Sequence, residues 1–137
     1  MKYAALALAL CACGSQPGPP DAGAVFPADA LLSLDTDASK LKLELRSSPQ
    51  PPARGVNAFR YNLRTPAGGP AEGLSFTVQP WMPAMGHGAS VSPTIIERGG
   101  GVYDLTNVAL AMPGTWQLRT TFVGSVEDFT APTVEIP

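Results

Sequence analysis

The sequence has few charged residues and a single histidine, and each of these scarcities excludes a class of function. Charged residues make up 15% of the 137 residues, and the formal net charge is −2. Nucleic-acid binding requires clustered Lys and Arg to neutralise phosphates, so we expect no nucleic-acid partner. Because His87 is the one histidine, the chain by itself cannot build a zinc site from several imidazoles.

Sequence motifs of known catalytic chemistry are also missing. The chain has no Gly-x-Ser-x-Gly motif and no glycine-rich phosphate loop that leads into a helix. It also lacks a paired histidine–carboxylate motif. We therefore expect a protein that is not an enzyme.

Residues 1–12 have the pattern of a signal peptide, and residues 13–30 that of a flexible tether. Lys2 supplies a positive charge, and the apolar run that follows it ends at Ala12. This run is too short to span a membrane as a helix but fits the apolar part of a signal peptide. Residues 15–30 are rich in Pro and Gly and show no hydrophobic period, which is typical of a semi-extended tether.

The segment Leu10-Cys11-Ala12-Cys13 resembles a bacterial lipobox. This resemblance implies that Cys13 becomes the lipidated first residue of the mature protein, which would anchor it to a membrane on the periplasmic side. Gly14, in place of an aspartate at the next position, favours the outer membrane. Two alternatives are lipidation of Cys11 and cleavage near Ala12 as an ordinary secretory peptide.

Apolar and polar residues alternate through residues 31–137, as they do in half-buried strands. The alternating segments are 41–46, 59–64, 74–79, 116–122 and 134–136, and two further apolar segments, 95–96 and 102–108, flank a glycine-rich turn. About seven short strands without a helix predict one all-β domain, an antiparallel β-sandwich of immunoglobulin-like type. A small β-barrel is the alternative architecture. Trp116 and Tyr103 are the expected large core residues.

The loop of residues 81–88 has the most distinctive chemistry in the chain. Thioether sulfur selects Cu(I), and imidazole binds both oxidation states of copper. We therefore consider Met85 and His87 candidate copper ligands, because two residues so spaced in an extended segment project to one side. Met82 would join them if the loop curls, and the ring of Trp81 would cover the metal.

The same residues also fit a purely structural role. Methionine packs well against aromatic side chains, and His87 would then bond to the backbone. Met112 begins a Met-Pro-Gly turn, in which it would be either a further sulfur ligand or simply part of the turn. The chemistry of these side chains leaves both interpretations open.

Three segments resemble, in order, the motifs of the YtkA-like domain family. They are Met-Pro-Ala-Met-Gly-His-Gly at 82–88, Gly-Val-Tyr at 101–103 and Met-Pro-Gly-Thr-Trp at 112–116. The resemblance implies a small secreted or lipid-anchored bacterial β-sandwich. More distantly, the chain resembles FixH-like proteins of cytochrome oxidase assembly and periplasmic copper-binding sandwiches. This resemblance implies copper as the bound metal, with Cu(I) favoured by the thioethers, and a copper protein or an oxidase-assembly component as the partner.

Two functions follow from these observations. The first is a lipid-anchored periplasmic module that binds or delivers copper through its Met/His loop. The second is a structural or protein-interaction domain of the cell envelope that binds no metal.

Overall fold

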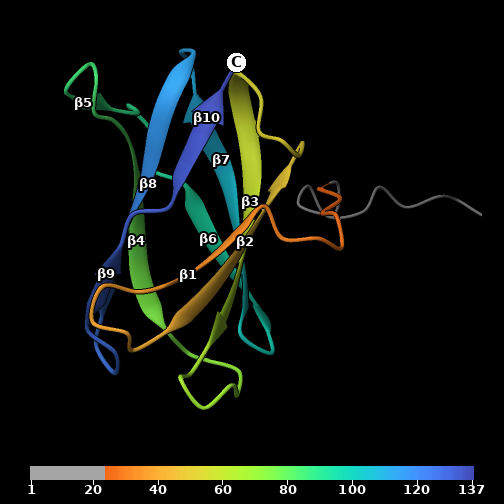
Figure 1. Cartoon of the computed structure of the whole chain (residues 1–137), viewed down its shortest axis with the longest axis vertical. Helices are drawn as coiled ribbons and strands as arrows, with labels where there is room; N and C mark the ends of the chain where they lie inside the picture. Colours follow the sequence, from red (N-terminus) through yellow and green to blue (C-terminus); the bar gives the residue numbers. More distant parts are fainter. Residues whose placement is uncertain (1–23) are drawn as a thin grey trace, which may run out of the picture.

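The computed structural model describes residues 24–137, which form two antiparallel β-sheets and contain no helix (Figure 1). Within this range, accordingly, no helix has the length and apolar character needed to cross a membrane. The signal peptide and the lipidated Cys13 predicted from the sequence lie outside the described residues.

Sheet A contains five strands in the order β1-β2-β3-β7-β6. Their bounds are Leu32–Asp35 for β1, Lys42–Ser48 for β2, Gly55–Arg64 for β3, Val102–Leu110 for β7 and Thr94–Gly99 for β6.

Sheet B has the order β10-β8-β4-β5, and β9 also pairs with β8. Their bounds are Thr133–Ile136 for β10, Gly114–Val123 for β8, Ser75–Met82 for β4, His87–Gly88 for β5 and Asp128–Thr130 for β9. The two sheets face one another in Figure 1, which confirms the predicted all-β sandwich.

The structure adds three short strands to the seven predicted ones. The seven segments predicted from alternation correspond to β2, β3, β4, β6, β7, β8 and β10. The added strands, β1, β5 and β9, contain four, two and three residues. Segments this short contain too few residues to show an alternating pattern in the sequence. Each of them forms a strand by pairing with a longer neighbouring strand.

The core lies between the inner faces of the two sheets. Trp116 and Tyr103 are 2% and 1% exposed, which confirms both as core residues. Phe76 of sheet B packs against Tyr61 and Tyr103 of sheet A, with ring centroids 5.9 and 5.2 Å away. The Tyr61 hydroxyl also hydrogen-bonds the Thr120 hydroxyl across the core at 2.9 Å. Burial raises the pKa of the Tyr61 phenol, and the bond to Thr120 only partly offsets this effect.

The outer face of sheet A carries a nearly buried carboxylate between two cations. Arg60 donates two hydrogen bonds to Asp104, at 2.7 and 2.9 Å, and Arg98 donates one at 2.9 Å. Burial would raise the pKa of Asp104, but the hydrogen bonds from Arg60 and Arg98 outweigh it and hold the pKa below its ordinary value. These ion pairs stabilise the charged Asp104 carboxylate, although water has little access to it.

The last residues of the predicted tether contact sheet A. The Phe26 ring lies 4.4 Å from the Arg60 guanidinium. Arg46 donates twice to the Ala28 carbonyl, at 3.2 and 2.9 Å, and Gln50 donates to the carbonyl of the next residue at 3.1 Å. The chain is therefore attached to the domain from Phe26 onward, before β1 begins.

Asp128 joins the β1–β2 connection to the hairpin of β8 and β9. Its carboxylate accepts hydrogen bonds from the Thr36 hydroxyl at 2.6 Å and from the N–H groups of Ala38 and Lys40 at 2.9 and 3.2 Å. Burial would raise the pKa of Asp128, but these bonds, with one from the N–H of Phe129, lower it to about 2. The native state therefore favours the ionised form.

Replacing Asp128 by asparagine should reduce the free energy of unfolding at pH 7 by roughly 1 kcal/mol, a modest value because the carboxylate is partly exposed. The pKa is lower in the folded than in the unfolded state, so the stabilisation is complete above about pH 4 and is lost as the pH falls toward 2. Urea unfolding at several pH values measures this. A wild-type advantage that persists undiminished at pH 2 would contradict the role of Asp128.

Candidate metal site

The candidate residues lie on and beside the hairpin of β4 and β5. Met82 pairs with His87 across this hairpin, and Trp81 pairs with Gly88. The turn between them is closed by the N–H of Met85, which donates to the Met82 carbonyl at 3.2 Å. Residues 83–86 therefore form a turn, not the extended segment that would project Met85 and His87 to one side. Met85 instead lies at the tip, and its side chain is 53% exposed.

Met82 and His87 share one face of the hairpin because directly paired residues of antiparallel strands point to the same side. That side is the core side, where Met82 is only 4% exposed. The Met82 methyl group reaches Gly114 at the start of β8, so closely that a Cβ at position 114 would lie 2.8 Å from it. Gly114 also has a φ of +124°, which side-chain-bearing residues rarely adopt.

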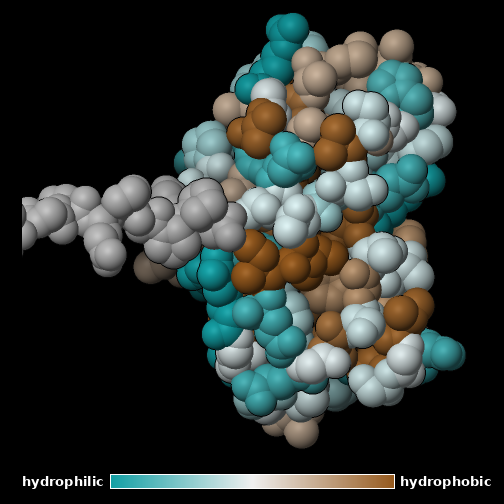
Figure 2. Space-filling model, turned by 180° about the vertical axis from the view of Figure 1, so that it is seen from behind, coloured by the Kyte–Doolittle hydropathy of each residue, from teal (hydrophilic) through white to brown (hydrophobic). Residues whose placement is uncertain are grey.

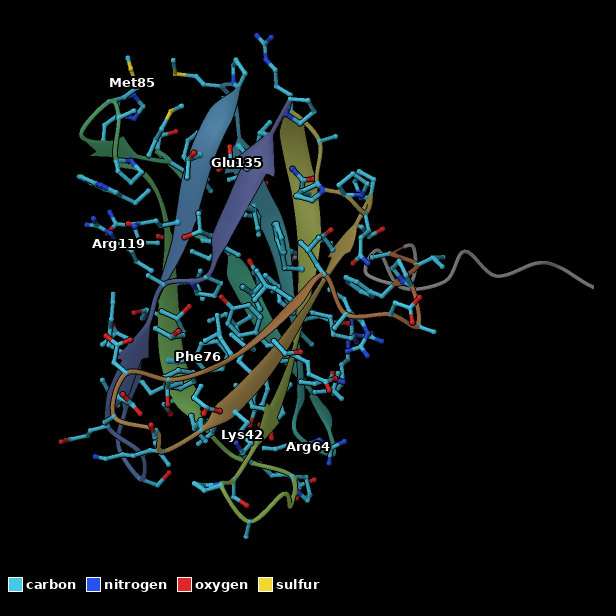
Figure 3. The ribbon with its side chains drawn as sticks, in the orientation of Figure 1. Lys42, Arg64, Phe76, Met85, Arg119 and Glu135 are labelled. Atoms are coloured by element: carbon cyan, nitrogen blue, oxygen red, sulfur yellow. The ribbon has the colours of Figure 1, made fainter. Side chains whose placement is uncertain are left out.

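Met112 approaches the same end of the sandwich from the connection between β7 and β8. It is partly buried against the core, and its carbonyl accepts a hydrogen bond from the Trp116 indole N–H at 2.9 Å. Met82, Met85 and Met112 are the methionines of the described residues, and the sulfur atoms in Figure 3 gather at the end where Met85 is labelled. We call this the methionine end.

Trp81 lies apart from the sulfur atoms, on the outer face of sheet B. Its ring stacks on the Arg119 guanidinium at 4.5 Å, and Arg119 lies on the same outer face. The structure thus brings Met82, His87 and the Met112 turn to one end, with Met85 at the exposed tip, and places the indole of Trp81 on the opposite side of β4.

The donor set at the methionine end is soft. It consists of thioethers and one imidazole, and among residues 24–137 no three His, Cys, Asp or Glu side chains lie close enough together to hold a metal ion. His87 is exposed, and its Nδ1 lies 3.4 Å from the Gly88 carbonyl oxygen, so the ring remains accessible. Such donors suit Cu(I), whereas zinc prefers thiolate, imidazole and carboxylate.

Two supporting residues of this end were not recognised from the sequence. Trp116 was expected in the core, but its hydrogen bond to the Met112 carbonyl was not foreseen. The close contact of Gly114 with Met82 was missed as well. The Met-Pro-Gly-Thr-Trp segment does hold a signal for the hydrogen bond of Trp116. An indole four residues after the start of a turn can reach back to the carbonyl of the residue that begins the turn.

Comparison with known proteins gives a family and no closer relative. The model of a family described as YtkA-like matches residues 35–121, which is well over half of the chain and includes both the hairpin and the Met112 turn. No curated protein and no solved structure matches the chain.

Trp116→Ala should lower the free energy of unfolding by about 3–5 kcal/mol, as expected for a large buried aromatic residue. Trp116→Phe should cost about 1–2 kcal/mol, because the Met112 carbonyl then loses its donor. Urea denaturation measures both changes. Trp81→Phe is the matched control on the outer face, and a cost equal to that of Trp116→Phe would show that the indole bond contributes nothing specific.

Proposed function

This chain belongs to the YtkA-like family, and on that premise we propose that it is a binding module of the cell envelope that holds one Cu(I) ion at the methionine end. The observation that carries the proposal is the pairing of Met82 with His87 on the side where the Met112 turn closes the sandwich. The proposal is for binding or delivery of the metal, without catalysis.

The four candidate ligands differ in how freely they can move. Met82 is held in the core by its contact with Gly114, whereas Met85 and His87 are exposed on the hairpin. Met112 is intermediate, since its backbone is fixed by Trp116 while its side chain is partly buried. A bound copper ion would supply a soft Lewis-acid centre with a preference for sulfur.

This division of roles fits delivery better than permanent storage. Exposed Met85 and His87 would reach an incoming or outgoing ion first, and the thioethers nearer the core would shield it from water. A recipient copper protein or oxidase-assembly component would dock at the exposed hairpin tip. The alternative function, an envelope interaction domain without metal, uses the same tip as a docking element.

Anaerobic titration with Cu(I) against a competing chelator should show one ion per chain. The full chain is used with Cys11→Ser and Cys13→Ser, so that no thiol competes. Met85→Leu and Met112→Leu keep the side-chain volume and remove a sulfur, and each should weaken binding about tenfold, or about 1.4 kcal/mol. His87→Ala should weaken the binding of both Cu(I) and Cu(II), and Zn²⁺ should bind poorly.

Trp81→Phe and Arg119→Gln are the controls for this titration, because both residues lie on the outer face of sheet B. Neither change should alter copper affinity. Copper binding that survives the removal of Met85, Met112 and His87, or binding weaker than about micromolar, would reject the metal site and favour the interaction domain.

We further propose that Cys13 anchors the protein by lipid to the periplasmic face of the outer membrane. The lipobox-like segment of residues 10–13 supports this assignment. Two or more acyl chains hold a protein stably on a bilayer, whereas one chain binds only marginally.

Radiolabelled fatty acid fed to an expressing bacterium should be incorporated into this protein. Cys13→Ser should abolish the label, whereas Cys11→Ser, the matched control two residues earlier, should retain most of it. Label lost equally in both variants, or retained only through Cys11, would refute the assignment, and fractionation of the two membranes tests the location.

A further inference from the structure

A cleft opens on the outer face of sheet A, at the opposite end of the sandwich from the methionines. Its volume is about 370 Å³, within the usual range for small-molecule sites. The outward-facing side chains that line it come from β1, β2 and β3, and they are Ser33, Asp35, Lys42, Glu44, Asn62 and Arg64. Figure 3 labels Lys42 and Arg64 close together, far from Met85.

The strand register arranges these side chains in two rows. Asp35, Lys42 and Arg64 are paired across β1, β2 and β3 and form the first row. Ser33, Glu44 and Asn62 are paired in the same way and form the second row. Both rows point outward because they are two residues apart on each strand, which separates them by about 7 Å.

The first row has spare hydrogen-bond donors with positive charge. Lys42 donates to Asp35 at 3.2 Å, and Arg64 donates to the Gly68 carbonyl at 3.3 Å. An ammonium has three donors and a guanidinium five, so within the described residues most of these donors are free. An anionic group of a ligand would be bound here by charge-assisted hydrogen bonds.

The second row has spare acceptors. The Glu44 carboxylate accepts one bond from Arg46 at 3.3 Å and is otherwise half exposed. The carboxylate therefore keeps acceptor positions for the N–H donors of a ligand. The Asn62 side-chain oxygen, in contrast, is too buried for a ligand to reach.

We propose that this cleft binds a small zwitterion with an anionic group at one end and a primary ammonium at the other. The anionic group contacts Lys42 and Arg64, and the ammonium donates to Glu44. The cleft is lined by two cations and two anions, which matches a ligand that carries charges of both signs. Phosphoethanolamine has this chemistry, either as a free molecule or as a phospholipid headgroup. The inference is independent of copper binding.

The first experiment is a calorimetric titration of the full chain with soluble phosphoethanolamine. We expect saturable binding of one molecule per chain. Phosphocholine has the same charges but no N–H donor, so its affinity should be at least tenfold lower, and inorganic phosphate should also bind more weakly. Equal affinity for phosphocholine, or the absence of saturable binding, would overturn the proposal.

Variants locate the two halves of the site. Arg64→Gln should weaken phosphoethanolamine binding about tenfold by removing the charge that holds the phosphate. Glu44→Gln should also weaken it, by removing the carboxylate that accepts from the ammonium. Arg119→Gln, on the opposite sheet, is the matched control and should bind as the wild type does. Unchanged affinity in Arg64→Gln, an exposed position where no loss of folding is expected, would also overturn the assignment.

Vesicles distinguish the two sources of the ligand. Vesicles of phosphatidylcholine alone are compared with vesicles that also contain phosphatidylethanolamine. Apolar segments of the chain would bind both kinds of vesicle, so a difference in binding reports on the headgroup. Stronger binding to the vesicles with phosphatidylethanolamine, reduced by Arg64→Gln, supports a lipid headgroup as the ligand. Binding of soluble phosphoethanolamine without a vesicle preference supports a free zwitterion in the same cleft.

Discussion

Burial of one face of each sheet against the other is the constraint on which the rest of this domain depends. The long strands β2, β3, β4 and β8 alternate buried and accessible side chains over much of their length. Phe76 packs against rings of both sheets, and the bond between Tyr61 and Thr120 joins the sheets at a polar point inside the core. The burial of one face leaves the other free for charged and polar rows, and the cleft on sheet A depends on this separation.

At the methionine end, core packing and the placement of soft donor atoms rest on the same contacts. Met82 fills the space over Gly114, and the Trp116 indole fixes the turn that carries Met112. These contacts close the end of the core with flexible, polarisable side chains. The same contacts place sulfur atoms beside the exposed hairpin of Met85 and His87. Side chains that complete the core packing therefore also provide soft donor atoms at the methionine end.

The outer face of sheet A is organised by charge. Asp104 is held between Arg60 and Arg98, and Phe26 covers Arg60 from the N-terminal side. Toward the other end of the strands, Lys42 and Arg64 have donors to spare. One face of the sandwich therefore attaches the incoming chain and also forms a cleft, while the methionine end carries the exposed hairpin tip.

The sequence by itself determined the fold class, the seven longer strands and the family, because alternation with a period of two and the local motif segments are properties of neighbouring residues. The residues of the candidate metal site were also visible as a cluster of Met and His. Tertiary structure decided what the sequence could not: it turned Trp81 away from the sulfur atoms, placed Met82 in the core beside His87 and brought Gly114 against Met82. It also assembled the cleft from β1, β2 and β3, whose register sets Lys42 beside Arg64. These relations join residues far apart in the chain, so they depend on strand register and on the closure of the two sheets, which no local pattern encodes.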